Sequence, residues 1–431
     1  MQFKQYPSYK PSGVEWLGDV PEHWQQKPIW SLFKRIKRTN FPTERLLSVY
    51  RDYGVIPKDS RDDNHNRASE DLTPYQLVCA NDLVINKMKA WQGSIAISEL
   101  RGIVSPAYYI YQPKAEYHSK YIHFLIRSAY YIQSYKNYSK GIRVNQWDLE
   151  SEAFTHIDLL LPSLDEQQKI VAFLDTETTR IDNLIAKQEK LIELLEEQRK
   201  SIISHAVTKG LNPNAPMKDS GVEWLGEVPE HWDVKSYRFV SKIYRGKFGH
   251  RPRNDPSLYD GEYPFIQTGD VARAGKYIQT YSQTLNEKGK AVSQVFTSGT
   301  LVMAIAANIG DTAILNFEAY APDSVVGFKP HKNIDLEFLR FSFIASLQAL
   351  EQTAVQSTQA NLNVERIGAL KTTFPPLSEQ IEISNYLNAE NEKNNHLISK
   401  QNQLIEKLKE YRASIISHAV TGKIDVREFG A

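Results

Sequence analysis

Cysteine is almost absent from the sequence, since Cys79 is the only one among 431 residues. The chain therefore cannot form an internal disulfide, and it offers no CxxC or Cys/His spacing for a metal site. We interpret Cys79 as a small buried apolar residue. The N-terminal segment MQFKQYPSYKPSG lacks the apolar stretch of a signal peptide, and no apolar run approaches the ~18 residues that a membrane span needs. We expect a soluble, cytoplasmic protein that binds neither a metal nor a membrane.

Motifs for cofactor binding and catalysis are also missing. The sequence has no GxGxxG fingerprint, and residues 269–277 (GDVARAGKY) have the wrong spacing for a P-loop. Phe374–Leu377 lacks the Asp or Asn that would begin an adenine-methylation motif, and Pro322-Asp323 is not followed by the D/E-x-K of a nuclease. His205 and His418 lie near expected helix ends, where the helix dipole is explanation enough. We therefore predict no catalytic residue and no cofactor bound by this chain.

The net charge is small as well, at +1, whereas dedicated nucleic-acid binders are often strongly basic. With 41% hydrophobic and 24% charged residues the composition is that of a folded protein. The length is too great for one ordinary core, so two or three domains are expected. The distribution of charge is consequently more informative than its sum.

The chain contains an internal duplication, which is the feature to establish first in a sequence of this length. Three segments occur twice in the same order: SGVEWLGDVPEHW (Ser12–Trp24) and SGVEWLGEVPEHW (Ser220–Trp232), PSLDEQQKI (Pro162–Ile170) and PPLSEQIEI (Pro375–Ile383), RKSIISHAVTKG (Arg199–Gly210) and RASIISHAVTGK (Arg412–Lys423). The first pair is offset by 208 residues and the other two by 213. Two variable segments, roughly 25–160 and 233–373, therefore lie within a constant frame.

The variable segments consist of short β-type runs separated by Gly and Pro. Each also contains an expected helix, at residues 120–134 and 336–352. We interpret each variable half as an α+β globule with a similar fold and a different surface.

The constant frame is helical. No Gly or Pro occurs from Glu166 to Val207, and apolar residues recur there at alternating spacings of three and four, which is typical of a coiled coil. Each expected helix ends at an HAVT segment followed by Gly210 or Gly422. A helix of about 40 residues is roughly 60 Å long and would expose its apolar stripe, so we expect it to pair with its repeat.

We predict that the seam of this coil contains Ile181, Leu184, Gln188, Leu191, Leu195, Leu397, Gln401, Leu404 and Leu408. Gln188 and Gln401 interrupt the apolar stripe at equivalent positions. Each either fixes the register inside the seam or lies at its edge facing water.

The expected fold class is thus α+β, with two similar α/β globular domains separated by a long antiparallel two-helix coiled coil and related by a pseudo-two-fold duplication. The predicted domain boundaries are 1–160 and 211–373 for the globular domains and 161–210 and 374–431 for the helices. Trp16, Trp24, Trp224 and Trp232 belong to the repeated motif. They either pack each globule on the coil or contact a partner protein.

A basic run follows each copy of the VPEHW motif. Residues 27–45 hold six basic residues and one acidic residue, and residues 235–253 hold seven basic residues and no acidic one. Such a run can be merely a solvated face, but two at equivalent positions favour phosphate binding. Residues 166–208 hold six basic and eight acidic residues, which makes that helix a poor phosphate-binding surface.

Polar loops in each half could read DNA bases, since Asn and Gln can bind adenine and Arg can bind guanine. Asn in such loops is equally common as a turn former. The candidate DNA-binding residues are Lys34, Arg35, Lys37, Arg38, Lys87, Lys89, Lys140, Arg143, Asn145, Gln146, Arg245, Lys247, His250, Arg251, Arg253, Gln267, Thr268, Gln359 and Asn361.

The duplicated SGVEWLG-(D/E)-VPEHW, the PLSEQ-type helix start and the SIISHAVT helix end closely resemble the specificity subunits of type I restriction–modification systems. The resemblance covers essentially the whole chain. It implies two target recognition domains that each read one part of a split site in double-stranded DNA. It further implies that the coiled coil separates these domains and helps to dock two methyltransferase (modification) subunits, which endonuclease/translocase subunits join.

The same resemblance places adenine-N6 methylation and ATP-dependent cleavage on those partners, together with S-adenosylmethionine, ATP and Mg. Two other classes of protein compete with this interpretation. A self-contained nuclease–methyltransferase would need the catalytic motifs that are missing. A purely structural scaffold would show no DNA binding with steep salt dependence.

Overall fold

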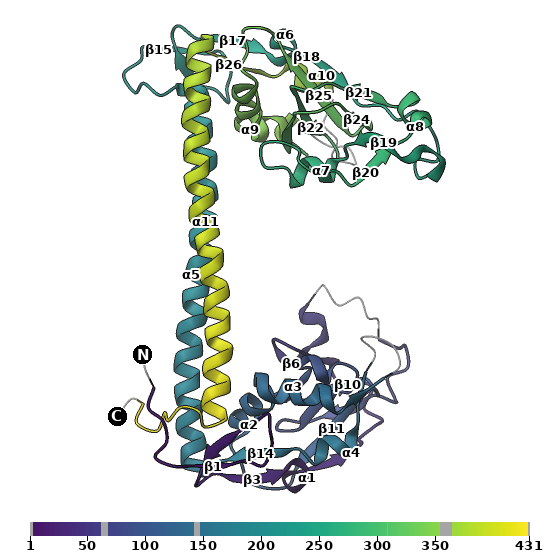
Figure 1. The fold of residues 1–431 in the computed structure, drawn as a ribbon, viewed down its shortest axis with the longest axis vertical. Helices are drawn as coiled ribbons and strands as arrows, with labels where there is room; N and C mark the ends of the chain where they lie inside the picture. Colours follow the sequence, from purple (N-terminus) through teal and green to yellow (C-terminus); the bar gives the residue numbers. More distant parts are fainter. Residues whose placement is uncertain (1–2, 62–67, 142–146, 308, 354–363, 430–431) are drawn as a thin grey trace. The chain divides into compact units, whose positions relative to one another are not determined.

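The computed structural model describes residues 3–61, 68–141, 147–307, 309–353 and 364–429 (Figure 1). The chain folds as two compact units: unit 1 is Met1–Gln188 with Asn402–Ala431, and unit 2 is Glu189–Gln401. The helices α5 (Leu164–Lys209) and α11 (Leu377–Val420) each contribute one half to either unit. Among the described residues, no helix is both long and apolar enough to cross a membrane.

Unit 1 is built on a four-stranded antiparallel sheet of order β4-β11-β8-β9. Its elements before α5 are β1 (Tyr9–Pro11), β2 (Asp19–Pro21), β3 (Gln25–Pro28), α1 (Ile29–Leu32), β4 (Phe33–Ile36), β5 (Leu47–Tyr50), β6 (Gly54–Pro57), β7 (Gln76–Val78), β8 (Leu83–Asn86), β9 (Ile95–Ile97), β10 (Gly102–Val104), β11 (Tyr108–Pro113), α2 (Ser119–Ile126), α3 (Ala129–Asn137), β12 (Ser139–Lys140), β13 (Asp148–Leu149), α4 (Ser151–Thr155) and β14 (Asp158–Leu161). Short 3-10 turns lie at Lys58–Ser60 and Ala90–Gln92.

Unit 2 repeats this sheet as β18-β25-β22-β23, again antiparallel. Its elements between α5 and α11 are β15 (Met217–Asp219), β16 (Glu227–Pro229), β17 (Asp233–Ser236), α6 (Tyr237–Val240), β18 (Ser241–Arg245), β19 (Tyr259–Phe265), α7 (Thr268–Arg273), β20 (Gln283–Leu285), α8 (Glu287–Ala291), β21 (Gln294–Phe296), β22 (Thr300–Ala304), β23 (Thr312–Leu315), β24 (Ala319–Ala321), β25 (Val325–Pro330), α9 (Leu336–Thr353), α10 (Val364–Ala369) and β26 (Lys371–Phe374). A 3-10 turn lies at Pro256–Leu258.

Both sheets are covered on two faces, which explains the continuous apolar runs in their central strands. In unit 1, Leu83 and Ile85 of β8 pack in one core with Tyr121 and Ile122 of α2, while Val84 faces a second cluster. In unit 2, Leu301 and Met303 pack with α9, and Val302 packs in a cluster whose other members come mainly from α7 and the strands β21, β23 and β24. The predicted fold class, two similar α/β globules joined by paired long helices, is confirmed.

The two units differ in what covers the second face. Unit 2 adds a four-stranded sheet of order β20-β19-β24-β21, whereas unit 1 has two separate two-stranded pairs, β5-β6 and β10-β7. The expected single helix at residues 120–134 is also two helices, because the chain is extended at Ser128. Arg127, just before it, donates to the carbonyls of Tyr50 and Ile95, at 3.4 and 3.0 Å.

In each unit the strand after the VPEHW motif pairs with the strand that precedes a long helix. These pairs are β3 with β14 and β17 with β26. The motif itself binds the first turns of that helix. Glu166 of α5 accepts hydrogen bonds from Trp24 Nε1 at 3.1 Å and binds His23 Nε2 at 2.9 Å. Glu379 of α11 accepts from Trp232 Nε1 at 2.9 Å and binds His231 Nε2 at 2.7 Å.

The same two tryptophans cover the end of the other long helix. Gly422 after α11 and Gly210 after α5 have positive φ values of 71° and 80°, as glycine C-caps do. A Cβ at Gly422 would lie 3.3 Å from the Trp24 ring and 2.3 Å from Pro21, and one at Gly210 would lie 3.1 Å from the Trp232 ring. Trp24 and Trp232 are each only 1% exposed, which confirms their packing role.

Within each unit the halves of α5 and α11 lie side by side and run antiparallel (Figure 1). In unit 1, Ile181 and Ile185 share a hydrophobic cluster with Leu408 and Ile415, and Arg412 Nε is 2.8 Å from Asp182 Oδ1. In unit 2, a cluster joins Ile203 and Ala206 to Ile383 and Leu387, and Arg199 Nη1 donates to Asn395 Oδ1 at 3.0 Å.

Three predicted seam residues are wrong. Leu191, Leu397 and Leu404 are 39%, 42% and 41% exposed. The next residue is the more buried one in each case, namely Ile192, Ile398 and Ile405. Each position is a Leu-Ile pair, so the apolar stripe can be drawn through either residue, and the packing selects the isoleucines. Ile181 is fully buried, whereas Leu184, Gln188, Leu195, Gln401 and Leu408 are half-buried.

The two ends of the chain pack together in unit 1. Asp425 N–H donates to the Lys4 carbonyl at 2.8 Å, and Lys4 Nζ lies 2.7 Å from Glu428 Oε2. The ring of Phe173 on α5 contacts Phe3 and Phe429, with centroids 5.6 and 4.8 Å apart. In unit 2 the corresponding connection is the continuous chain from α5 to β15.

We predict that Glu166→Ala lowers the free energy of unfolding of unit 1 by about 1–3 kcal/mol, because the buried Trp24 N–H loses its acceptor. Hydrogen exchange of peptides from β2, β3 and the start of α5 is the measurement, since it resolves the two units. Glu189→Ala, at an exposed position of the same helix, is the control and should leave exchange unchanged. Equal protection in Glu166→Ala and wild type would contradict a stabilising role for this carboxylate.

Candidate nucleic-acid interface

The basic run of unit 2 continues from β18 into a loop that converges on one aspartate. Arg253 Nη2 donates to both carboxylate oxygens of Asp323, at 2.6 and 2.7 Å. Arg245, the last residue of β18, donates from Nε to the Asp323 carbonyl at 2.5 Å. Asp323 therefore binds two arginine side chains, and both arginines are exposed. The arrangement orients guanidinium groups that could contact phosphates or guanine.

Next to this cluster lies a hollow of about 460 Å³, which we call the unit 2 hollow. Its lining residues are Phe248, Arg253, Asn254, Pro256, Tyr259, Asp260, Phe265, Gln267, Gln283, Pro322 and Ser324. Two predicted residues, Arg253 and Gln267, both line this hollow, although Arg253 precedes β19 and Gln267 follows it.

Amide and aromatic groups give the hollow its chemical character. The Gln267 side chain donates to Gln283 Oε1, and the rings of Phe248 and Phe265 stack obliquely with centroids 5.3 Å apart. Gln267 also precedes α7, where its N–H donates to Asp270 Oδ2 at 2.9 Å. Asn254, Gln283 and Ser324 were missed from the sequence, because single polar residues in loops carry no signal until the fold gathers them.

Some of the other predicted residues of unit 2 have accessible side chains, and others form hydrogen bonds within their own loop. Lys247 is exposed and Thr268 is half-buried. His250 Nε2 lies 3.0 Å from Asp255 Oδ2, and Arg251 Nη1 donates to the carbonyls of Phe248 and His250, both at 2.8 Å. These contacts hold the loop in shape, so His250 and Arg251 have at least a positioning role.

In unit 1 the predicted segments around residues 35, 87 and 140 meet. The Arg35 guanidinium lies 4.2 Å from the centre of the Tyr109 ring, and its Nη1 donates to Ser151 Oγ at 3.1 Å. Lys87 Nζ lies 2.9 Å from Asp148 Oδ2. That contact, more than any other, raises the pKa of Lys87 above its ordinary value. Leu149 N–H donates to the Lys87 carbonyl at 2.9 Å, so β13 is fixed to this loop.

Aromatic side chains near this cluster were not singled out from the sequence. The rings of Trp91 and Trp147 have centroids 5.1 Å apart, and Lys136 Nζ lies 5.9 Å from the Trp147 ring. A half-buried aromatic pair beside basic residues can stack on sugars or bases. A sequence signal was present for Trp147, because it directly follows the polar segment 139–146.

Arg38 forms an ion pair with a buried carboxylate. Its Nη1 lies 2.6 Å from Asp82 Oδ2, and the Asp82 side chain is only 2% exposed. The same carboxylate oxygen accepts from the Cys79 N–H at 2.8 Å. Because a buried carboxylate needs such a partner, Arg38 has a structural role in unit 1, and its contact with DNA stays a prediction.

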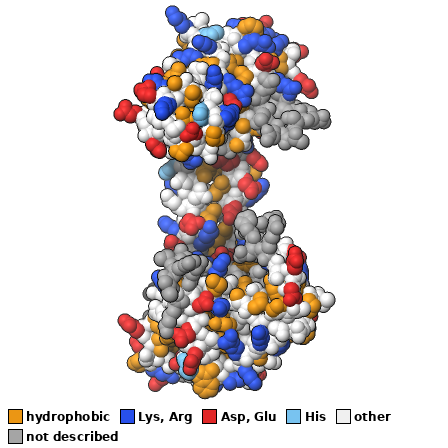
Figure 2. Space-filling model, turned by 90° about the vertical axis from the view of Figure 1, so that its right-hand side faces the viewer, with side chains coloured by type: hydrophobic (Ala, Val, Ile, Leu, Met, Phe, Trp, Pro, Cys, Tyr) orange, Lys and Arg blue, Asp and Glu red, His pale blue; other side chains and the backbone are white. Residues whose placement is uncertain are grey.

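The remaining predicted residues have simpler outcomes. Lys34, Lys37 and Lys89 are exposed. The Lys140 side chain and the residues Arg143, Asn145, Gln146, Gln359 and Asn361 lie outside what the structure describes. Figure 2 shows Lys and Arg side chains on the visible face of each unit, mixed with acidic and apolar ones. Within the described residues, no group of His, Cys, Asp and Glu could hold a metal ion.

The chain matches the model of a known protein family. The family model described as "Type I restriction modification DNA specificity domain" matches twice, at residues 21–196 and 229–407. This chain belongs to that family. The two matches begin at the equivalent prolines Pro21 and Pro229, so the family model detects the same duplication as the repeats. The specificity family assigns the chain a non-catalytic role.

Two relatives are similar to this specificity chain over most of its length. It is 25% identical to the type I restriction enzyme MjaVIII specificity subunit of Methanocaldococcus jannaschii, over 95% of this chain and 94% of the relative. It is 21% identical to the EcoKI specificity subunit of Escherichia coli K12, over 85% and 82% of the two chains.

Solved structures agree on the fold. A chain from a structure of complex assembly and conformational transition of the type I R-M system matches with a TM-score of 0.67 at 15% identity, covering 93% of this chain and 98% of that one. The HsdS subunit from Thermoanaerobacter tengcongensis matches with a TM-score of 0.51 at 15% identity, covering 94% and 98%.

We predict opposite effects on DNA binding from the two members of the Arg253–Asp323 pair. Arg253→Ala should weaken binding and reduce the salt slope by up to about one. Asp323→Ala should strengthen binding, because it removes a carboxylate that competes with phosphate for Arg253, while Arg245 keeps its bond to the main-chain carbonyl of residue 323. Fluorescence anisotropy with duplex DNA at several salt concentrations measures both effects.

The control for this pair is Glu197→Ala, which removes an exposed negative charge from α5. It should change neither affinity nor slope. If both members of the pair changed affinity in the same direction, the cluster would be a structural device and not part of the DNA surface.

Proposed function

We propose that each unit of this specificity subunit reads one half of a split double-stranded DNA sequence. The observation that carries this proposal is the duplication of one sheet with two different polar surfaces. Unit 1 offers Arg35 and Lys87 beside Tyr109, and unit 2 offers Arg253, Gln267 and Gln283 in the unit 2 hollow. Two different readers on one frame suit a bipartite sequence better than a palindrome.

The chemistry belongs to other subunits in this proposal. Methylation of adenine N6 and ATP-dependent cleavage are assigned to two methyltransferase subunits and to endonuclease/translocase subunits. S-adenosylmethionine, ATP and Mg would be bound by those partners and not by this chain. The lack of methylation, P-loop and nuclease motifs in the sequence supports the assignment.

We further propose that the paired helices set the gap between the two half-sites and provide a docking surface for the methyltransferase subunits. The matched lengths of the repeats support the first part, because PSLDEQQKI and RKSIISHAVTKG keep a common offset of 213 residues from their counterparts. Exposed apolar side chains on the helices, such as Leu194 at 49% and Ile381 at 45%, support the second.

We predict that the two half-sites respond separately to mutation. Gln267→Ala with Gln283→Ala should relax the preference at one or two positions of a single half-site, since a bidentate base contact contributes about 1–3 kcal/mol of discrimination. Arg35→Ala with Lys87→Ala should affect only the other half-site. The measurement is the methylated adenine motif in a host that carries each variant with its methyltransferase partner.

The matched control is Gln198→Ala with Gln403→Ala, which removes two exposed amides from α5 and α11. It should leave the whole motif unchanged. A variant of one unit that altered both half-sites would show that the units do not read DNA independently.

We also predict the effect of lengthening the coil. Four residues inserted after Gln188, with four more after Gln401, add about 6 Å of helix at about 1.5 Å per residue. At about 3.4 Å per base pair, the gap between half-sites should grow by one or two base pairs while both half-sites keep their sequence. An insertion in one helix alone should impair activity, because it puts the apolar stripes out of register. Normal activity with an unchanged gap would assign the spacing to another part of the chain.

A further inference from the structure

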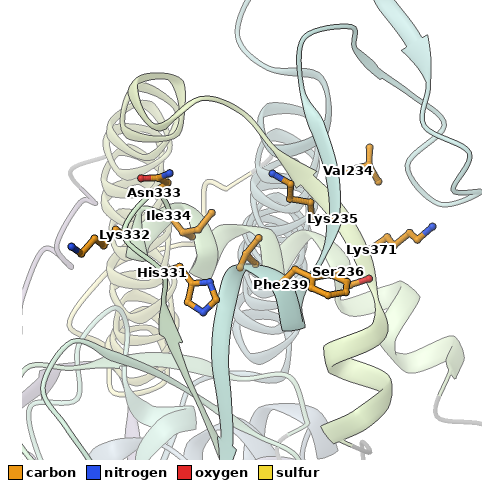
Figure 3. Close-up of a pocket in the computed structure, with 10 residues that line it drawn as sticks. Val234, Lys235, Ser236, Phe239, His331, Lys332, Asn333, Ile334 and Lys371 are labelled. Atoms are coloured by element: carbon orange, nitrogen blue, oxygen red, sulfur yellow. The ribbon is translucent and has the colours of Figure 1, made fainter.

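A second hollow in unit 2 has a different character from the first. It encloses about 700 Å³ and lies between β17, α6, the segment after β25 and the first residue of β26. Its lining residues are Val234, Lys235, Ser236, Phe239, Val240, His331, Lys332, Asn333, Ile334 and Lys371 (Figure 3). We call it the Phe239 pocket.

Phe239 is unusual among the described apolar side chains. It is 69% exposed, more than any other large apolar side chain in the described part of the chain. Its neighbours in α6, Tyr237 and Val240, are 0% and 3% exposed, so this short helix turns them inward and Phe239 outward. Burying a Phe side chain stabilises by about 1.5–3 kcal/mol, and the fold of unit 2 leaves that gain unused.

The pocket around this ring is positively charged. Lys235, Lys332 and Lys371 line it and are exposed, and His331 also lines it (Figure 3). None of the lining residues is acidic. Within the described part of the chain these lysines form one ion pair, between Lys235 Nζ and the exposed Asp233 at 2.7 Å, and exposed pairs contribute little to stability. An occupant should therefore combine carboxylates with an apolar side chain.

Unit 1 has an exposed aromatic ring and a base at the equivalent helix, with the ring one position earlier in that helix than Phe239. Trp30 of α1 is 51% exposed, and Lys114 Nζ lies 5.6 Å from its ring. The equivalence rests on backbone hydrogen bonds: Lys114 N–H donates to the Leu32 carbonyl at 2.8 Å, and His331 N–H donates to the Val240 carbonyl at 2.9 Å. In this register Ser31 corresponds to Phe239 and Trp30 to Arg238, so the two units present an exposed ring from neighbouring positions of equivalent helices.

The position in unit 2 argues for a protein occupant. In the pairing of β18 with β25, Ser241 opposes Pro330 at the Phe239 pocket, while Arg245 opposes Val326 near the unit 2 hollow. The two hollows thus lie at opposite ends of one strand pair. Large aromatic side chains are also enriched in contacts between proteins.

We propose that the Phe239 pocket and the Trp30–Lys114 site each bind an acidic segment of one methyltransferase subunit, with an apolar side chain against the ring. The proposal rests on the proposed function and deepens it, because one such site per unit accounts for two partner subunits per chain. It adds a contact on the globular part of each unit to the one proposed for the helices.

The test is the stoichiometry and affinity of the complex with the methyltransferase subunit of the same system, measured by native mass spectrometry and titration. Phe239→Ala with Lys371→Glu should weaken binding of one methyltransferase subunit by about 10- to 30-fold. Trp30→Ala with Lys114→Glu should weaken binding of the other. All four substitutions together should weaken both, while binding of duplex DNA by the specificity chain alone stays unchanged.

The matched control is Tyr281→Ala with Lys288→Glu, which replaces an exposed aromatic and an exposed lysine elsewhere in unit 2. It should leave both subunits bound. Unchanged methyltransferase affinity in the Phe239 and Trp30 variants would overturn the proposal, and so would a loss of DNA binding with both subunits still bound. A wild-type chain that bound no methyltransferase subunit would instead overturn the proposed function.

Discussion

A carboxylate in the first turns of each long helix holds the geometry on which the rest of the chain depends. Burying a charged group is costly unless several donors satisfy it, and Glu166 has two, Trp24 and His23. The Trp24 ring also covers Gly422, the residue that ends the antiparallel helix. One side chain therefore fixes the start of one helix against the end of the other. Unit 2 repeats the arrangement with Glu379, Trp232 and Gly210, which explains why VPEHW and the SEQ-type helix start recur together.

The two repeats keep the same contacts at the helix ends even where the order of residues in the sequence differs. In the first repeat the lysine precedes the glycine, as Lys209-Gly210, whereas in the second it follows, as Gly422-Lys423. Both lysines nevertheless reach the same carbonyls of the repeated motif, Leu225 and Glu227 in unit 2 and Leu17 and Asp19 in unit 1. Because the frame closes through these contacts, the second face of each sheet is free to differ. Unit 2 accommodates a complete second sheet there, and unit 1 two strand pairs. A frame of this kind lets surfaces diverge without altering how the helices pair.

Repeats and periodicity predicted the frame well, because both are long and local signals. The helices, their glycine caps and the matching α/β halves followed from the sequence. The seam failed at Leu191, Leu397 and Leu404, since a Leu-Ile pair offers two stripes of equal hydrophobicity and only packing chooses between them. The structural role of Arg38 was not predicted, because its partner Asp82 lies 44 residues away in the sequence and meets it only in the folded chain. The unit 2 hollow was invisible for the same reason, because Gln267 and Gln283 meet only once β19 and β20 pair.

The near-neutral net charge conceals an uneven distribution of charged side chains in the folded chain. The basic run of residues 235–253 is divided along β18. Lys235 lies in the Phe239 pocket at one end, and Arg245 lies with Arg253 around Asp323 at the other. At least one acidic residue that lowers the sum, Asp323, is a partner that orients a particular cation. A long coil that carries more acids than bases would repel phosphate and leave DNA to the two globular surfaces. Charge distribution, and not total charge, is thus what makes this chain compatible with a sequence-reading role.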